Sequence, residues 1–310
     1  MANAIVSSLL SFSNAKSNYR LTNLQQQLLP TRDEIEFFHE HGWLITKQVL
    51  PESLIDRIFA ATEEFYSGVK DAELPIAGCS NWQQGDNTAV RNNEYISFQK
   101  KAFRELSLHP MIGSIAAKLM NTDTVRYFQD QLISKEPCQN HSTHVGWHTD
   151  RSYHSNCTSH KILTVWIPLH DVDEEHGSLV VVDRSHKWSS TNHLRGFNHN
   201  NHSSVEQEFT RQGKKFHKVP YKLKKGQISF HHSSIVHGSY PNRSNMMRRA
   251  IVLNLQDGEN RYQPYYNNGK QIHHFLDSLC CQQSDGFPDY TDPAVFPIIW
   301  SSQKSKRANN

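Results

Sequence analysis

Hydrophobic residues in the first 120 positions recur with the period of a helix in three stretches. Thr31 and Glu34 form a capping-box pattern that opens the first stretch, and Gly42 closes it. Pro51 stands in the first turn of a second helix, and residues 110–120 give a third. Helices are therefore predicted on the N-terminal side of the fold.

The period of the pattern changes at about residue 124. From there to about residue 257, short runs rich in β-branched and aromatic residues alternate with turn residues, and no long helical pattern separates them. The clearest of these runs are residues 125–128, 163–169, 178–182, 227–230 and 250–255. Short strands at this spacing predict a mainly β fold, either a sandwich, a barrel or a jelly roll.

The length of the chain and the composition of its ends predict one domain. A chain of 310 residues is near the upper size for one hydrophobic core, so residues 30–300 are expected to form a single domain with its β core over 124–257. Residues 1–29 lack sustained periodicity and are predicted to be a mobile arm, and residues 301–310 a disordered tail. The polar segment 72–95 is typical of a lid or a disordered loop.

Charge and hydropathy argue against two classes of partner. The 33 basic and 30 acidic residues leave a net charge of +3, which is too balanced to indicate nucleic acid or a membrane surface. No apolar run approaches the roughly 20 residues that a membrane helix needs. No pattern specifies an oligomeric state.

The cysteines indicate a reducing compartment. None of them forms a CxxC pair, and adjacent Cys280 and Cys281 cannot bridge each other without strain. The five residues are Cys79, Cys138, Cys157, Cys280 and Cys281. The start of the chain lacks the basic residues of a signal peptide, and its end lacks a Ser-Lys-Leu peroxisomal address. We therefore expect reduced thiols and a cytoplasmic location.

The candidate chemistry centres on His148, Asp150 and His237. Residues two apart on a strand face the same side, so His148 and Asp150 can reach one metal ion, with His237 supplied by a distant strand. Two imidazoles and one carboxylate on one face of an octahedron form the iron(II) site of non-haem oxygenases, whereas zinc more often takes a tetrahedral site. A chain with 20 histidines should contain about one His-x-Asp pattern by accident, so the context must decide.

That context is specific. Five motifs carry it: Trp-His-Thr-Asp at 147–150, Trp-Ile-Pro-Leu at 166–169, Gly-Ser-Leu at 177–179, Gly-Gln-Ile-Ser-Phe-His-His at 226–232 and His-Gly-Ser-Tyr-Pro-Asn-Arg-Ser at 237–244. They closely resemble the phytanoyl-CoA dioxygenase-like (PhyH) family of Fe(II)/2-oxoglutarate-dependent oxygenases. The resemblance covers about residues 30–257 and is concentrated between 131 and 250. It departs at Arg184, where glycine is common.

The resemblance implies a fold and a set of cofactors. The fold is a double-stranded β-helix, a cupin-like jelly roll with flanking N-terminal helices. Iron(II) would be held by His148, Asp150 and His237, and 2-oxoglutarate and O2 would be cosubstrates. The enzyme would be a dioxygenase that hydroxylates an unactivated C–H bond of a small-molecule substrate.

The resemblance also implies which residues bind 2-oxoglutarate. The family places an arginine eleven residues after the second histidine, which here is Arg248, with Arg249 as the competing assignment. A guanidinium can hold a carboxylate through two parallel hydrogen bonds. Further cosubstrate residues implied by the family are Ser239, Trp166, Gln131 and Ile133. Trp166 can also be read as a core residue, and Ser239 as a residue that stabilises a turn.

The substrate is expected to be polar. If the family geometry holds, the loop 72–95 and residues 151–154 border the pocket, and the candidate contacts are Arg91, Asn93, Arg151 and Tyr153. Their polarity favours a specialised metabolite over a fatty acyl chain, although solvent-exposed loops have the same composition. The loops are also similar to those of family members that act on alkaloid toxins of the cylindrospermopsin type.

Several alternatives use the same residues. Halogenases of this fold replace the carboxylate ligand with Gly or Ala, so the presence of Asp150 argues against one. Desaturation or epimerisation shares the same ligands and differs in substrate placement. From another class, a non-catalytic cupin-like metal- or ligand-binding module has no need for the triad together with Arg248. A zinc hydrolase would need a positioned general base, which the sequence does not mark.

Overall fold

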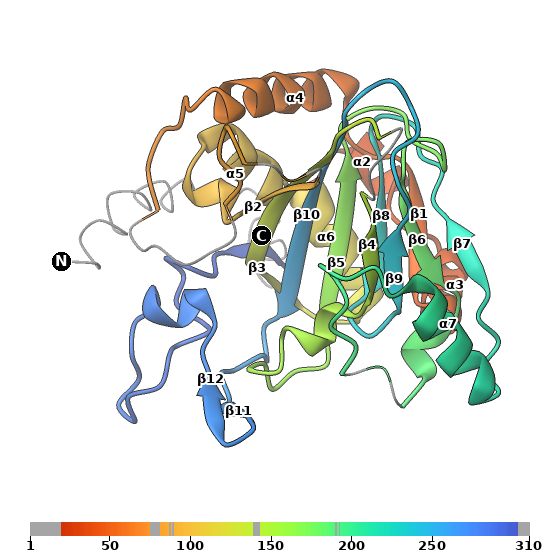
Figure 1. Ribbon diagram of the computed structural model, residues 1–310. Helices are drawn as coiled ribbons and strands as arrows, with labels where there is room; N and C mark the ends of the chain where they lie inside the picture. The colour runs from red at the N-terminus through yellow and green to blue at the C-terminus, as the bar shows by residue number, and fades with distance from the viewer. Residues whose placement is uncertain are drawn as a thin grey trace.

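Two antiparallel β-sheets form the centre of the computed structural model (Figure 1). The structure describes residues 20–74, 81–86, 88, 90–138, 143–189, 191 and 193–302. The larger sheet has the order β1-β8-β5-β10-β3-β13, with β2 paired to β3. Its strands are β1 Trp43–Gln48, β2 Val90–Glu94, β3 Thr124–Lys135, β5 Ile162–Pro168, β8 Gln227–His232, β10 Arg248–Asp257 and β13 Ile298–Ser301.

The smaller sheet has the order β4-β9-β6-β7. Its strands are β4 Val145–His148, β6 Leu179–Val182, β7 Lys218–Pro220 and β9 His237–Ser239. A separate hairpin pairs β11 Tyr265–Asn267 with β12 Lys270–Ile272. The described strands form two facing sheets and no closed barrel, so the predicted mainly β, jelly-roll class is confirmed.

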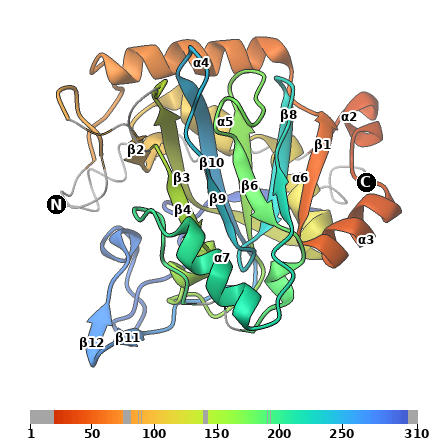
Figure 2. The same ribbon diagram turned by 45° about the vertical axis from the view of Figure 1, so that its right-hand side comes forward.

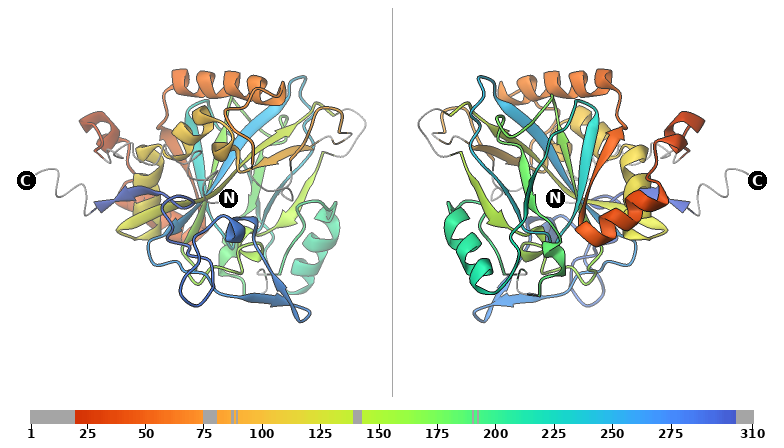
Figure 3. Two further views of the ribbon diagram at one scale, coloured as in Figure 1. Left: turned by 90° about the vertical axis from the view of Figure 1, so that its left-hand side faces the viewer. Right: turned by 90° about the vertical axis from the view of Figure 1, so that its right-hand side faces the viewer.

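Helices cover the outer faces of both sheets. They are α2 Asn23–Gln27, α3 Arg32–His41, α4 Glu52–Tyr66, α5 Lys101–Ser107, α6 Pro110–Met120 and α7 His202–Arg211. Figure 3 shows α6 and α7 on opposite sides of the sheets. On the smaller sheet, α7 packs Val205 against a cluster that contains Trp147, Val180 and Val182. Figure 2 shows this helix in front of the sheet.

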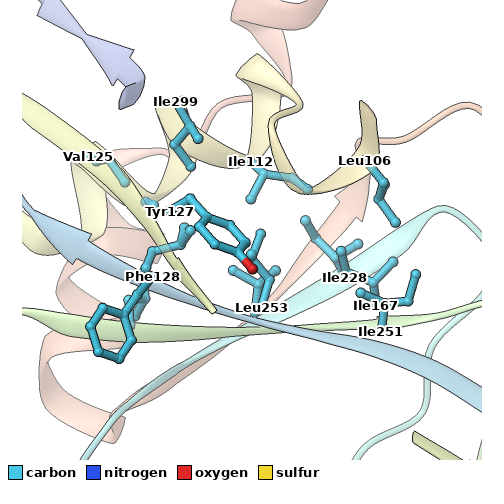
Figure 4. Close-up of a cluster of buried hydrophobic side chains, with 14 of the residues drawn as sticks. Leu106, Ile112, Val125, Tyr127, Phe128, Ile167, Ile228, Ile251, Leu253 and Ile299 are labelled. Atoms are coloured by element: carbon cyan, nitrogen blue, oxygen red, sulfur yellow. The ribbon is translucent and has the colours of Figure 1, made fainter. Parts of the chain in front are cut away.

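The main hydrophobic core lies between the larger sheet and its helices. Leu106 of α5 and Ile112 of α6 point toward Tyr127, Ile167 and Leu253 of the sheet (Figure 4). All of these side chains are almost completely buried. Because successive side chains of a strand alternate, this core uses one face of the larger sheet and leaves the other face for the space between the sheets.

The three predicted helices are present. Thr31 and Glu34 form the capping box of α3, and Gly42 ends it in the left-handed conformation with φ +84. Helix α6 spans Pro110–Met120, the range that the periodicity predicted. Strand β3 begins and β10 ends at the predicted limits of the β region, 124 and 257. The larger sheet nevertheless extends beyond that region through β1, β2 and β13.

Other segments differ from the sequence prediction. Residues 20–29, assigned to a mobile arm, contain the capped helix α2, and Leu21 is buried. The polar segment 72–95 ends in strand β2, and helices α5 and α7 were not predicted. Their apolar residues are too few for a clear periodic pattern, so tertiary packing decides these elements. The remaining parts of the predicted arm and tail, residues 1–19 and 303–310, lie outside the described residues, as does Cys79.

Among the described residues, no helix has the length and hydropathy needed to cross a membrane. The four described cysteines, Cys138, Cys157, Cys280 and Cys281, are free thiols.

Candidate active site

The structure brings His148, Asp150 and His237 together between the two sheets. His148 ends β4 and is the cross-strand partner of His237, which begins β9. Asp150 follows in the 3-10 turn Asp150–Ser152. One potential ligand atom from each of the three residues lies within 4.8 Å of the others. The arrangement is therefore compact enough to hold one metal ion.

Backbone carbonyls orient both imidazoles. Nδ1 of His148 lies 2.8 Å from the carbonyl oxygen of Gly146, and Nδ1 of His237 lies 3.0 Å from that of Ile235. A carbonyl only accepts, so Nδ1 must carry the hydrogen in each ring and Nε2 keeps its lone pair. Burial lowers the pKa of both histidines, which keeps them neutral. Two neutral imidazoles fixed in this way are suited to bind a metal ion.

The two oxygens of Asp150 have different surroundings. Oδ2 accepts a hydrogen bond from Thr164 Oγ1 at 2.5 Å and lies 3.2 Å from His231 Nε2, whereas Oδ1 lies 3.6 Å from His237 Nε2. Asn254 in turn donates to Thr164 Oγ1 at 2.8 Å. Burial raises the pKa of Asp150, but the hydrogen bond with His231 helps to hold that pKa well below its usual range. The carboxylate is thus ionised, with Oδ2 tied to the larger sheet and Oδ1 directed at the metal position.

A cavity of about 370 Å³ adjoins the triad and is lined by both sheets. All of the cosubstrate residues that the sequence singled out line it, namely Gln131, Ile133, Trp166, Ser239 and Arg248. Of the four predicted substrate contacts, only Tyr153 does.

The side chains of Arg248 and Arg249 point to opposite faces of the larger sheet. Arg248 is 2% exposed, and its guanidinium lies 5.8 Å from the centre of the Trp166 ring. Its Nε is buried and has no hydrogen-bond partner among the described residues. Burial lowers the pKa of Arg248 to about 10, so the side chain is still charged at neutral pH. Arg249 points to the other face of the sheet, where Nη1 lies 2.5 Å from Glu63 of α4. A buried, incompletely bonded guanidinium in the cavity fits a carboxylate ligand.

On strand β2, the residues that line the cavity are the sequence neighbours of the two predicted substrate contacts. Arg91 and Asn93 face away from the cavity: Arg91 stacks over Trp82 at 4.1 Å, and Asn93 donates to the carbonyl of Trp82 at 2.9 Å. Asn92 and Glu94 line the cavity instead. This corrects the substrate assignment, and the reason is the alternation of side chains along a strand, since a shift of one residue reverses the face.

Arg151 is also placed outside the cavity lining. Its guanidinium donates to the carbonyl oxygens of Ser159 at 2.7 Å and Cys157 at 3.1 Å, so it stabilises the loop that follows the triad. The substrate assignment of Arg151 is therefore corrected to a structural one.

Several lining residues were missed by the sequence analysis. Gln129 lies two positions before Gln131, so strand alternation from that residue would have identified it. His231 stands in the motif 226–232 but carries no spacing signal of its own. His273, His274 and Phe275 come from the C-terminal segment, which reaches the cavity only through the tertiary fold.

We expect Thr164→Val to weaken metal binding while preserving the fold, because valine keeps the shape of threonine and removes its hydroxyl. Loss of an outer partner of a metal ligand typically costs about 10–100-fold in affinity. Equilibrium titration with iron(II) or manganese(II) measures this loss. Thr158→Val is the matched control, since among the described residues that hydroxyl accepts only from a loop amide, that of Arg261. Equal affinities for the two variants would contradict the role of Thr164.

Comparison with known proteins identifies relatives over most of the chain. The family model of phytanoyl-CoA dioxygenase (PhyH) matches residues 38–250. The peroxisomal phytanoyl-CoA dioxygenase of Bos taurus is 24% identical over 275 residues, which cover 83% of this chain and 76% of that protein. Dioxygenase olcK of Penicillium canescens is 22% identical, with 72% of this chain and 70% of olcK covered.

Solved structures share the fold. The non-heme alpha ketoglutarate dependent carbocyclase SnoK from nogalamycin biosynthesis has a TM-score of 0.65 at 23% identity, covering 87% of this chain and 96% of SnoK. EctD from S. alaskensis with 2-oxoglutarate and 5-hydroxyectoine has a TM-score of 0.64 at 17% identity, covering 84% and 86%. The family match spans well over half of the chain and contains the triad. The chain therefore belongs to the PhyH family of iron- and 2-oxoglutarate-dependent oxygenases.

Proposed function

We propose that the chain hydroxylates an unactivated C–H bond of a small polar molecule. His148, Asp150 and His237 are the iron ligands of this proposal. Its strongest support is the presence of this triad and the incompletely bonded guanidinium of Arg248 in one cavity. A non-catalytic binding module would have no use for both features.

The chain's own residues would hold and orient the cosubstrate. Arg248 and the hydroxyl of Ser239 bind the far carboxylate of 2-oxoglutarate, Trp166 forms the wall beneath the guanidinium, and Gln131 and Ile133 flank the iron from β3. When bound, iron and 2-oxoglutarate supply the oxidising chemistry with O2. The protein positions the target C–H bond and excludes water, which is the part of catalysis that depends on geometry.

Epimerisation or desaturation is the second candidate. It uses the same ligands, and the structural neighbours include a carbocyclase and the epimerase SnoN as well as EctD. Hydroxylation is preferred because it requires no further residue to redirect the reaction after the C–H bond is broken.

The substrate end of the cavity favours a polar ligand. Glu94, Asn92 and Gln129 line it, and Gln131 donates to Glu94 Oε1 at 3.0 Å. Burial lowers the pKa of His154 to about 4 and that of His274 to about 3, so both imidazoles are neutral hydrogen-bonding groups. With Arg248 assigned to the cosubstrate and Asp150 to the metal, the described lining offers the carboxylate of Glu94 and polar side chains such as Asn92 and Gln129. These suit a neutral or cationic molecule better than an anionic one.

The size of the cavity also favours a small substrate. Its volume of about 370 Å³ is near the lower end of the usual range for ligand pockets, and part of it must hold 2-oxoglutarate. A small specialised metabolite fits this space better than a long acyl chain. An alkaloid of the cylindrospermopsin type is one such molecule.

We place the protein in the cytoplasm, without nucleic-acid or membrane partners. The supporting observations are four free thiols, a net charge of only +3 and no described helix able to span a membrane.

Anaerobic titration with iron(II) and then 2-oxoglutarate tests the cofactor site. We expect the weak visible charge-transfer band of the iron–2-oxoglutarate chelate to form in the natural protein. Asp150→Ala should lose this band and all hydroxylation, because it removes one of three ligands and the negative charge at the metal. A folded variant that keeps full turnover would overturn the triad assignment.

Arg248→Ala and Arg249→Ala form a matched pair on neighbouring residues of β10. We expect Arg248→Ala to raise the KM for 2-oxoglutarate by about tenfold or more, since a buried charge-assisted pair is worth about 1.5–3 kcal/mol. Arg249→Ala should leave this KM unchanged and lower stability, because it removes the contacts with Thr62 and Glu63. If Arg249→Ala raises this KM and Arg248→Ala does not, Arg249 is the residue that binds the far carboxylate.

The rate of succinate formation after addition of a candidate substrate distinguishes small polar substrates from a fatty acyl-CoA. Small amines, guanidines and uncharged ring compounds are compared with phytanoyl-CoA, and we expect stimulation only in the first group. For a cationic substrate, Glu94→Gln should raise the KM about tenfold through loss of one charge-assisted contact. Stimulation by phytanoyl-CoA alone would refute the polar-substrate proposal.

A further inference from the structure

Lys135 is a buried lysine at the end of β3, beside the cavity. The side chain is completely buried. Its Nζ lies 2.6 Å from Ser239 Oγ, 2.9 Å from the carbonyl oxygen of Tyr240 and 3.4 Å from that of Ser239. A protonated lysine has three N–H donors, so these three acceptors match its capacity. The ammonium group is thereby held against the end of β9.

The charge of Lys135 has no counter-charge among the described residues. Its three acceptors are uncharged, and its cross-strand partner on β10 is another buried cation, Arg248. Burial, and then the positive charge of Arg248, lower the pKa of Lys135 well below its usual range. Two buried cations side by side are costly unless an anion compensates them. The positive charges at this end of the cavity therefore favour the binding of an anion.

Lys100 shows how a structural lysine is accommodated in the same protein. It is 6% exposed, but its Nζ lies 2.8 Å from Glu64 and 3.1 Å from the carbonyl oxygen of Val69. Burial of Lys100 is thus compensated by a carboxylate from the chain itself. Lys135 lacks such a described partner and lies next to the residues that line the cavity.

Ser239 connects Lys135 to the cavity. Ser239 and Arg248 both line the cavity, whereas Lys135 lies behind Ser239. When Lys135 donates to Ser239 Oγ, that oxygen acts as the acceptor, and the hydroxyl hydrogen of Ser239 can point to a ligand.

We propose that Lys135 is a positioning residue for 2-oxoglutarate, which orients the Ser239 hydroxyl and adds a second buried positive charge behind the far carboxylate. This inference rests on the cosubstrate site proposed above. Lys135 acts through Ser239 and at a distance, so it should affect recognition of the far carboxylate and leave chelation of the metal by the keto acid unchanged.

Binding of two keto acids separates these effects. 2-Oxoglutarate and 2-oxopentanoate chelate a metal through the same groups, but 2-oxopentanoate carries a methyl group in place of the far carboxylate. Each is titrated anaerobically into the iron(II)-loaded protein, with the charge-transfer band as the readout. For Lys135→Met we expect the Kd of 2-oxoglutarate to rise about tenfold or more and that of 2-oxopentanoate to stay unchanged.

Lys100→Met is the matched control, because it makes the same substitution at a buried lysine away from the cavity. It should leave the ratio of the two Kd values at the natural value. Equal weakening of both keto acids by Lys135→Met, or no change in either, overturns the proposal for Lys135. If the natural protein forms no band with 2-oxoglutarate, the proposed function itself fails, which is a separate result.

Two further variants keep the test decisive if Lys135→Met does not fold. Lys135→Gln retains amide donors for the neighbouring carbonyls and removes the charge, so it should show the same selective loss. In a Ser239→Ala background, the loss caused by Lys135→Gln should be smaller than in the natural background, because the two residues act together. Full additivity would show that Lys135 does not act through Ser239.

Discussion

The pairing of β4 with β9 is the contact on which the rest of the site depends. It sets His148 opposite His237 and directs both imidazoles into the space between the sheets. Asp150 completes the triad from the turn after β4, but its carboxylate is tied to the larger sheet through Thr164 and His231. The three candidate ligands therefore connect the two sheets. Small changes in the distance between the sheets should alter the geometry at the metal directly.

Because side chains alternate along β3, one face of this strand packs in the core and the other lines the ligand site. Leu132 faces the helices and belongs to the main core, while Gln131, Ile133 and Lys135 point toward the cavity side. The same strand thus packs helices α5 and α6 on one face and shapes the ligand site on the other. Because the outer face is densely packed, the inner face is a rigid support, as a site that positions a cosubstrate requires.

Charge is distributed unevenly along the cavity. Arg248 and Lys135 lie at one end, where burial makes their charges costly without an anion. The other end carries Glu94 and the neutral imidazoles of His154 and His274. An anionic cosubstrate and a neutral or cationic substrate would be drawn to opposite ends of the cavity. This polarity would give each molecule one favourable orientation.

Local sequence determined those features that depend on residues near each other in the chain. Capping residues and periodicity predicted α3 and α6, and the change of period at residue 124 predicted the β region. The motifs around residues 147–150 and 237–248 selected the triad, Ser239 and Arg248 through their resemblance to the PhyH family. The structure places all of these residues at one cavity. Their roles as ligands are tested by the experiments above.

Tertiary structure alone decided which side chains of the remaining segments face the cavity. The sequence could not establish the register of β2 against β3, and a shift of one residue separates Arg91 and Asn93 from Asn92 and Glu94. His274 and Phe275 reach the site from a segment more than one hundred residues after the first ligand, and no local pattern encodes that approach. The same holds for Lys135, whose polarity suggests exposure until its contacts with β9 are known. Strand pairing and burial are long-range properties, so only the folded chain determines them.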